Sequence, residues 1–424
     1  MRSKLITVVT AVASVLLVAQ VAAADQVQEQ LRLMEQRMAE MEDRLQATSD
    51  ELRTAKATVS EQQSLLQDSG LIEGEDADIR SGAGGFLDMV SISGVVAASY
   101  NHRLINTSGT GNQNEGLFKT PDANTFQVDQ VWMILDKTPE DESRGGFHAE
   151  FFTGQSANSQ NGTGDDTVGI YSAYASYLAP IGNGVQIDAG RLGTPLGAEV
   201  VQTNGNYFIT QGSVFGLQPV TYTGVSLSTQ LTDELGLIVG AVNDVYSNTF
   251  NSPSMDKAYY GQLSYGGDMF GLNVGGIWGR DSGNCGNGGD GECNTSVVDV
   301  VLTADPTENL SLWANFDWKH SGGDNTPTHG DAFGISGAGR LGVTETVGVA
   351  TRVEYIKTED TLNGTADDNE LVTLTFTTDW TVAEGLVARA EIRWDTLVND
   401  FDGGRFTGGR NDQLTGLAQL YYEF

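Results

Sequence analysis

The sequence predicts an all-β transmembrane barrel of about 16 antiparallel strands, preceded by an N-terminal α-helical coiled coil. From residue 86 onward, segments of about ten residues alternate apolar with polar side chains, and the connections between them alternate between short and long. The chain ends on QLTGLAQLYYEF, whose alternate residues form one apolar face carrying Phe424 and one mostly polar face. Soluble edge strands are usually blunted by charge or proline, so this stretch favours a closing strand in a membrane interface over an ordinary half-buried strand.

The first 24 residues have the pattern of a secretory signal. Arg2 and Lys4 precede an apolar stretch at 5–18, and small residues at 22–24 form the cleavage site. The apolar stretch is too short to span a bilayer comfortably, and no apolar run of spanning length follows it. Of its 424 residues, 53 are glycine and eight proline, and the formal charge is -33, which argues against nucleic acid as a partner.

Two cysteines, Cys285 and Cys293, are the only ones in the chain, and both lie in a segment rich in Gly, Asn and Asp. A secreted chain reaches an oxidising compartment, so we expect a local disulfide, with free thiols or metal ligands as the alternatives.

Residues 25–67 predict a periplasmic coiled coil, because they contain neither Gly nor Pro and keep an apolar heptad over six repeats. One core position holds Leu, Met or Val throughout, whereas the other degrades to Thr, Ala and Gln toward its C-terminal end. The number of helices therefore stays open, and so does the alternative of a lone amphipathic helix. Residues 68–85 are expected to form a flexible linker.

The barrel is expected over residues 86–424, in eight pairs of strands. The strands running in one direction are predicted at 90–100, 145–153, 185–191, 235–244, 269–279, 310–319, 347–356 and 385–395. Their antiparallel partners are predicted at 125–136, 168–179, 222–231, 258–265, 296–304, 332–341, 371–380 and 413–424.

The two kinds of connection are predicted to lie at opposite ends of the barrel. The short ones, at 138–144, 180–184, 232–234, 266–268, 305–309, 342–346 and 381–384, have turn chemistry. The long ones, at 101–124, 154–167, 192–221, 245–257, 280–295, 320–331, 357–370 and 396–412, are rich in small polar residues. Short periplasmic turns and long outer loops are typical of outer-membrane barrels.

The spacing of apolar residues supports membrane placement. Phe270 and Trp278, for example, lie eight positions apart on one strand face, which is ~20 Å along a tilted strand and matches an outer-membrane apolar band. The opposite faces carry charges that would be costly in lipid, so parity puts them in the lumen. This predicted pore-lining set is Asp317, Lys319, Arg340, Arg352, Glu354, Arg389, Glu391 and Arg393. Sixteen strands enclose more space than side chains fill, which predicts an aqueous channel.

The connection at 192–221 is expected to fold inward and narrow the channel, because it is long and contains bulky residues that a solvated loop would not need. Its predicted constriction residues are Glu199, Tyr207, Phe208 and Phe215. The alternative is a loop packed over the barrel mouth or at a subunit contact.

Neither catalysis nor a cofactor is expected. Residues 284–294 are rich in Asp and Gly but lack the ordered ligand spacing of a calcium loop. The four histidines fall in separate segments without metal-ligand spacing, so no metal site is expected.

The run AYASYLAPIGNGVQIDAGRLGTPLGAEV, followed by QPVTYTGVSLSTQLTDELGLIVGAVND, resembles the OmpL-like beta-barrel porin-2 family. The resemblance covers residues 86–424 and implies a porin of the outer membrane of a Gram-negative bacterium. The coiled coil before the barrel resembles coiled-coil-bearing trimeric porins, which implies a homotrimer held together by coiled coil and barrel walls. The acidic inner-loop motif of the classical general porins is not found, so their constriction residues are not carried over.

The sequence therefore predicts passive diffusion of small hydrophilic solutes through a barrel surrounded by outer-membrane lipid. A strip of arginines at 340, 352, 389 and 393, facing the inward loop with Glu199 opposite, would favour anionic solutes. Ion pairs within the strip would instead only stiffen the wall. The rival function is a structural or adhesive protein, with a plugged barrel and a coiled coil that reaches toward peptidoglycan.

Overall fold

The computed structural model describes residues 89–105, 114, 117, 122–161, 168–246, 256–281, 294–322, 330–362, 365–398, 406 and 410–424. The predicted signal, coiled coil, linker and Cys285–Cys293 disulfide lie outside these residues. No helix among the described residues is long and apolar enough to cross a membrane.

Sixteen strands make up the described chain. They are β1 (Ser91–Arg103), β2 (Thr125–Lys137), β3 (Gly145–Thr153), β4 (Gly169–Ala179), β5 (Val185–Gly193), β6 (Thr221–Gln230), β7 (Leu235–Val242), β8 (Ala258–Gly266), β9 (Phe270–Arg280), β10 (Asn294–Thr307), β11 (Leu310–Gly322), β12 (Gly330–Gly342), β13 (Val347–Leu362), β14 (Thr365–Ala383), β15 (Leu386–Leu397) and β16 (Asp412–Glu423). Three short helices lie between strands: α3 (Gln155–Asn161), η1 (Thr203–Gly205) and η2 (Val214–Leu217).

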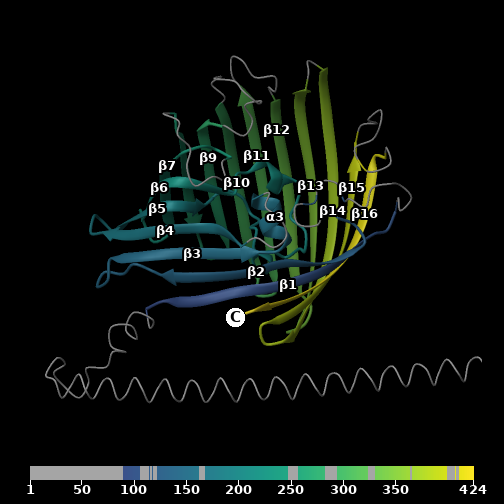
Figure 1. The fold of residues 1–424 in the computed structure, drawn as a ribbon, viewed down its shortest axis with the longest axis horizontal. Helices are drawn as coiled ribbons and strands as arrows, with labels where there is room; N and C mark the ends of the chain where they lie inside the picture. Colours follow the sequence, from purple (N-terminus) through teal and green to yellow (C-terminus); the bar gives the residue numbers. More distant parts are fainter. Residues whose placement is uncertain are drawn as a thin grey trace, which may run out of the picture. The chain divides into compact units, whose positions relative to one another are not determined.

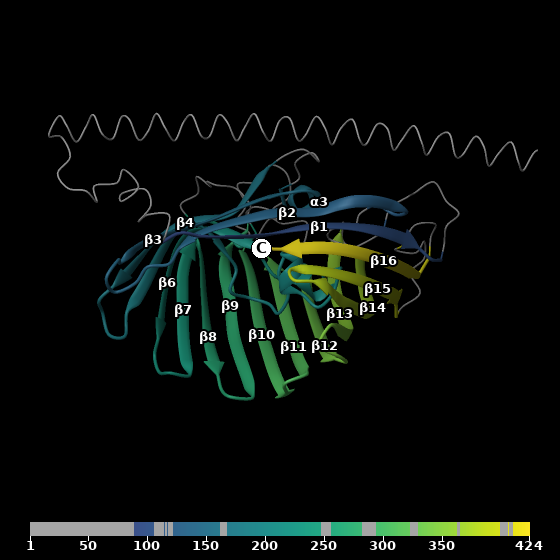
Figure 2. The same ribbon diagram turned by 90° about the horizontal axis from the view of Figure 1, so that it is seen from below.

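The strands close into one antiparallel barrel in chain order, and β1 pairs with β16 (Figures 1 and 2). The seam joins Val96 to Tyr422 in register, and Gly94 and Phe424 exchange backbone hydrogen bonds of 3.0 and 3.1 Å. An alanine at Gly94 would place its Cβ 2.7 Å from the Phe424 ring, so this position needs a residue without a side chain. The predicted closing strand and the count of sixteen are confirmed.

The two faces of the barrel differ as alternation requires. Large apolar side chains remain exposed on the outer face, among them Trp278 at 57% and Phe424 at 56%. On the inner face, Asp317, Arg352 and Glu391 are buried. An apolar exterior around a polar interior inverts the arrangement of a soluble barrel and fits a lipid-facing wall.

One connection differs from its prediction. Residues 357–370 were expected to form a long loop, but β13 continues to Leu362 and β14 begins at Thr365. The two strands stay paired to their ends, with Leu362 opposite Thr365. The sequence between them is Asn-Gly, a dipeptide typical of short hairpins, so continued pairing of the two strands agrees with the sequence.

Candidate channel constriction

The segment 194–220, between β5 and β6, lies inside the barrel. Its backbone receives hydrogen bonds from inward side chains of strands far apart around the barrel: Arg389 of β15 donates to Asn206 O at 2.8 Å, and Gln262 of β8 donates to Pro195 O. Gln130 of β2 donates to Val201 O at 2.5 Å. We call this segment the inner loop.

Arg352 on β13 forms the most buried attachment of the inner loop. Its Nη1 contacts Glu199 Oε1 at 2.5 Å and donates to Thr210 O at 2.9 Å, while the Phe208 ring lies 4.5 Å from the guanidinium carbon. Glu354 supplies a second carboxylate, 3.1 Å from Nε. Burial raises the pKa of the Glu199 carboxyl, an effect that the Arg352 charge opposes. Arg352 is therefore the counter-charge of a desolvated acidic pair.

β15 provides further charged attachments. Glu391 accepts hydrogen bonds from the backbone N–H groups of Ile209 and Thr210 at 2.6 and 3.2 Å. Arg393 donates to Gln211 O at 2.6 Å and is held in place by Asp395, at 2.9 Å. These hydrogen bonds involve charged groups, which makes them stronger than neutral ones. They fix residues 209–211 against the β13–β15 wall.

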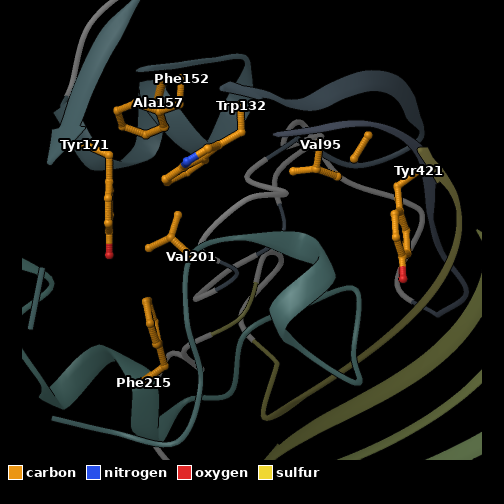
Figure 3. Close-up of a cluster of buried hydrophobic side chains, with 9 residues drawn as sticks. Val95, Trp132, Phe152, Ala157, Tyr171, Val201, Phe215 and Tyr421 are labelled. Atoms are coloured by element: carbon orange, nitrogen blue, oxygen red, sulfur yellow. The ribbon is translucent and has the colours of Figure 1, made fainter. Parts of the chain in front are cut away.

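Apolar packing fixes the other side of the inner loop. Val201 and Phe215 join a buried cluster with Trp132 of β2, Phe152 of β3 and Tyr171 of β4. Figure 3 shows Val201 between the Trp132 and Phe215 rings. The Trp132 ring centroid lies 4.8 Å from both the Phe152 and Tyr171 centroids. A lumen that holds such a cluster is partly filled with protein rather than water.

The predicted arginine strip differs from the structure in its layout. Arg352, Arg389 and Arg393 point inward, but they are buried beneath the inner loop instead of facing it across a channel. Glu199 lies beside Arg352 and not opposite the strip. Parity along a strand reveals which face a side chain occupies, but it cannot reveal where a distant loop settles on that face.

The other predicted pore-lining residues fall into two groups. Glu354 and Asp317 are buried, and Asp317 lies opposite Asp299 of β10 in register. Arg340 and Lys319 remain partly exposed: Arg340 binds both oxygens of Asp379, at 3.0 and 2.6 Å, and Lys319 lies 4.5 Å above the Tyr246 ring. These two cations, unlike the three arginines beneath the loop, are accessible from the lumen.

Sequence reasoning missed the anchors on β2 and β3. Gln130 holds both Val201 and Thr203 of the inner loop, and Glu150 accepts from Trp132 Nε1 and Gln202. The inward position of Glu150 could be predicted from alternation along its strand. That of Gln130 could not, because Gln130 follows a β-bulge that shifts the alternation of β2 against β1.

Two of the cavities beside the inner loop have little charge in their linings. One of about 420 Å³ is lined by side chains of β4–β8, including Gln186, Ser228 and Gln262. The other, of about 270 Å³, lies between residues 197–208 and β9–β11. In β6–β9 the only charged residue is Arg280, the last of β9. No group of three or more potential metal ligands occurs in the described residues.

A closed sixteen-stranded barrel with an apolar exterior and a loop folded into its lumen has the architecture of outer-membrane porins. The chain belongs to the OmpL-like beta-barrel porin-2 family, whose model matches residues 89–424. No curated protein is similar enough in sequence to count as a match.

Solved structures share the fold. An anion-selective porin from Comamonas acidovorans aligns with a TM-score of 0.55 at 11% identity, over 79% of this chain and 99% of that one. OmpT of Vibrio cholerae, an outer-membrane protein solved in a trimer form, gives 0.54 at 12% identity, over 79% and 99% of the two chains. The channel DcaP of Acinetobacter baumannii gives 0.52 at 14% identity, over 79% and 97%. At these identities the likeness concerns the fold alone.

Proposed function

We propose that this protein is a non-enzymatic porin through which small hydrophilic solutes diffuse across the outer membrane, and that the inner loop narrows its lumen. The observation that carries the proposal is the uneven distribution of charge around the loop. Charged anchors hold residues 199–213 against β13–β15, whereas the cavity along β4–β8 has no charged residue in its lining and the cavity along β9–β11 has only Glu199. Solutes would pass on the side of these two cavities.

Neutral solutes fit this path better than anions. The arginines that would attract an anion are buried beneath the loop, and the accessible Arg340 is already paired with Asp379. Desolvated charges paired with protein groups contribute little field to a permeating ion. The anion preference expected from the arginine strip therefore loses its main support.

Conductance of the purified full-length protein in planar lipid bilayers tests the proposal. We expect discrete steps of ion current, and a reversal potential near zero under a salt gradient. A reversal potential strongly displaced toward the anion equilibrium value would restore the arginine strip as a selectivity device. Absence of any conductance step from a folded, heat-modifiable barrel would rule out the channel.

The second candidate is a structural or adhesive outer-membrane protein with a plugged barrel. It draws support from the lumenal cluster around Trp132, because the inner loop and α3 occupy space that water would fill in an open channel. A folded protein without conductance, whose N-terminal region co-sediments with peptidoglycan, would favour this candidate.

For the whole protein we propose export by the signal at 1–24, a periplasmic coiled coil at 25–67, and a homotrimer assembled through coiled coil and barrel walls. The support is the heptad pattern of the sequence and the trimer form of a protein with the same fold. The disulfide between Cys285 and Cys293 belongs to the same set of proposals.

A further inference from the structure

We propose that the cavity between the inner loop and β9–β11 is a binding site for a neutral polyhydroxylated ring of monosaccharide size. The cavity is lined by Tyr207 and Phe208 of the loop, Asn273 of β9, Thr303 of β10 and Trp313 of β11. Its volume of about 270 Å³ lies just below the usual range of small-molecule pockets, ~300–1,000 Å³, and so suits a small ligand. The proposal rests on the proposed channel, which would bring solutes to this site.

Four of the polar side chains that line this cavity have no hydrogen-bond partner among the described residues. Hydrogen bonds occupy most inward polar groups of the barrel, such as Asn315, whose amide donates to Asp299 at 2.8 Å. In contrast, the amide of Asn273, the hydroxyls of Thr303 and Tyr207 and the indole N–H of Trp313 make no hydrogen bond within the described part of the chain. Such groups remain available to a ligand with several hydroxyls.

Aromatic rings provide the second element of the site. Trp313 and Tyr207 both pack against the buried cluster of Phe208, Ala338 and Ala350, which fixes both rings at the cavity. A sugar ring presents apolar C–H groups on its face and hydroxyls around its edge. Rings that are held by packing, next to free amide and hydroxyl groups, match both parts of such a ligand.

The charge of the cavity excludes ionic ligands. Glu199 is the only charged residue of the lining, and its oxygens are taken by Arg352 at 2.5 Å and by the N–H of Gly212 at 2.7 Å. A carboxylate ligand would find no free cation there, and an ammonium ligand would have to displace Arg352. Uncharged ligands therefore avoid an uncompensated desolvation cost that ionic ones would meet.

Isothermal titration of the full-length protein in detergent measures binding independently of transport. Glucose serves as the neutral probe, and glucuronate, which keeps the ring and adds a carboxylate, serves as its charged analogue. We expect saturable binding of glucose in the millimolar range, with glucuronate at least tenfold weaker. Equal binding of glucose and glucuronate, or no saturable binding of glucose, would overturn the proposal even if the protein conducts ions.

Two variants test the location of the site. Trp313→Leu and Asn273→Leu should each weaken glucose binding at least fivefold. Trp318→Leu is the matched control, because Trp318 lies on the same strand with the opposite parity, outside the lumen, and it should leave binding unchanged. Loss of binding in the Trp318 variant alone would place the site elsewhere. Failure of the bilayer experiment with intact glucose binding would refute the channel and keep the site.

Discussion

At the scale of single residues, Arg352 is the cation that holds the inner loop to the barrel. It lies between two buried carboxylates, Glu199 and Glu354, so loss of the arginine should destabilise the protein more than loss of one glutamate. Arg352→Gln would leave both carboxylates without a counter-charge and should cost about 3–5 kcal/mol of unfolding free energy. Glu199→Gln leaves Arg352 paired with Glu354 and should cost about 1–3 kcal/mol.

Urea unfolding in lipid vesicles would measure these two free energies. Asp141→Asn is the control, since the Asp141 side chain is 85% exposed and its ion pair with Arg144 should contribute at most about 1 kcal/mol. In bilayers the Arg352 variant should show larger and noisier current steps because its loop is released. A glutamate variant as damaging as the arginine variant would contradict the role of Arg352 as a shared counter-charge.

The effect of Asp317 on the stability of the barrel can also be tested. It is fully buried on β11, and the Asp299 carboxyl lies directly across the ladder within hydrogen-bonding reach of it. Asp317→Asn replaces one oxygen with a donor that can reach Asp299, so the barrel should gain about 1 kcal/mol in stability. Asn315→Ala should have the opposite effect, because it removes the present donor to Asp299. A destabilised Asp317→Asn barrel would show that the carboxyl makes a contact of its own.

At the scale of elements, the inner loop approaches the wall most closely at Gly212. A Cβ there would lie 2.1 Å from Glu354 Oε1 and 2.7 Å from Glu199 Oε2. Gly212→Ala must therefore push away the two carboxylates that hold the loop, at a cost of about 1–3 kcal/mol. Gly216 lies in the same loop, but a Cβ at that position would have no atom within 4 Å, so Gly216→Ala should be harmless.

Limited proteolysis of the folded protein distinguishes these two variants. The alanine at 212 should expose the inner loop to cleavage, whereas the alanine at 216 should leave the wild-type pattern. Equal protection of both would mean that the loop is held mainly by its apolar cluster around Trp132 and not by the carboxylates.

The strands could be predicted from the sequence because each is a local pattern. The 145–153 strand was located to the residue, and alternation placed Phe424 outside and Arg352 inside. Where the prediction failed, at 357–370, polar composition was taken for a loop although the strands pair to Leu362 and Thr365. Polar composition indicates that a segment is exposed to water, and a strand that extends beyond the membrane is exposed to water too.

The constriction could be predicted only in part, because its contacts join residues far apart in the chain. Arg393 and Gln211, for instance, are separated by 182 positions. The length and aromatic content of the segment 192–221 singled it out, and parity singled out the arginines. That the two are in contact, with the loop lying on the arginines, depends on the closed barrel and on the Trp132 cluster across the lumen, which no local pattern encodes.

At the scale of the whole molecule, the formal charge of -33 does not determine the charge of the lumenal surface. Acidic residues that lie in turns, outer connections and the segment before the barrel are screened within about 10 Å at 0.1 M salt. The cavity along β4–β8 has no charged residue in its lining, although β5 itself carries Asp188 and Arg191. An acidic protein can therefore leave part of its lumenal surface without charge.

The assembly of the molecule gives the last prediction. The backbone bonds of the barrel are closed within one chain through the β1–β16 seam, so folding of the barrel does not need the N-terminal region. The heptads at 25–67 would hold separate chains together. Deletion of 25–67, behind an intact signal, should therefore leave heat-modifiable barrels while crosslinking in detergent shifts from trimers toward monomers. A matched variant with Gly and Ser in place of residues 68–85 should keep the trimer, since it alters only the linker. If the full-length protein itself crosslinks as a monomer, the coiled coil cannot be the assembly element; if the deletion variant stays trimeric, the barrel walls alone hold the subunits.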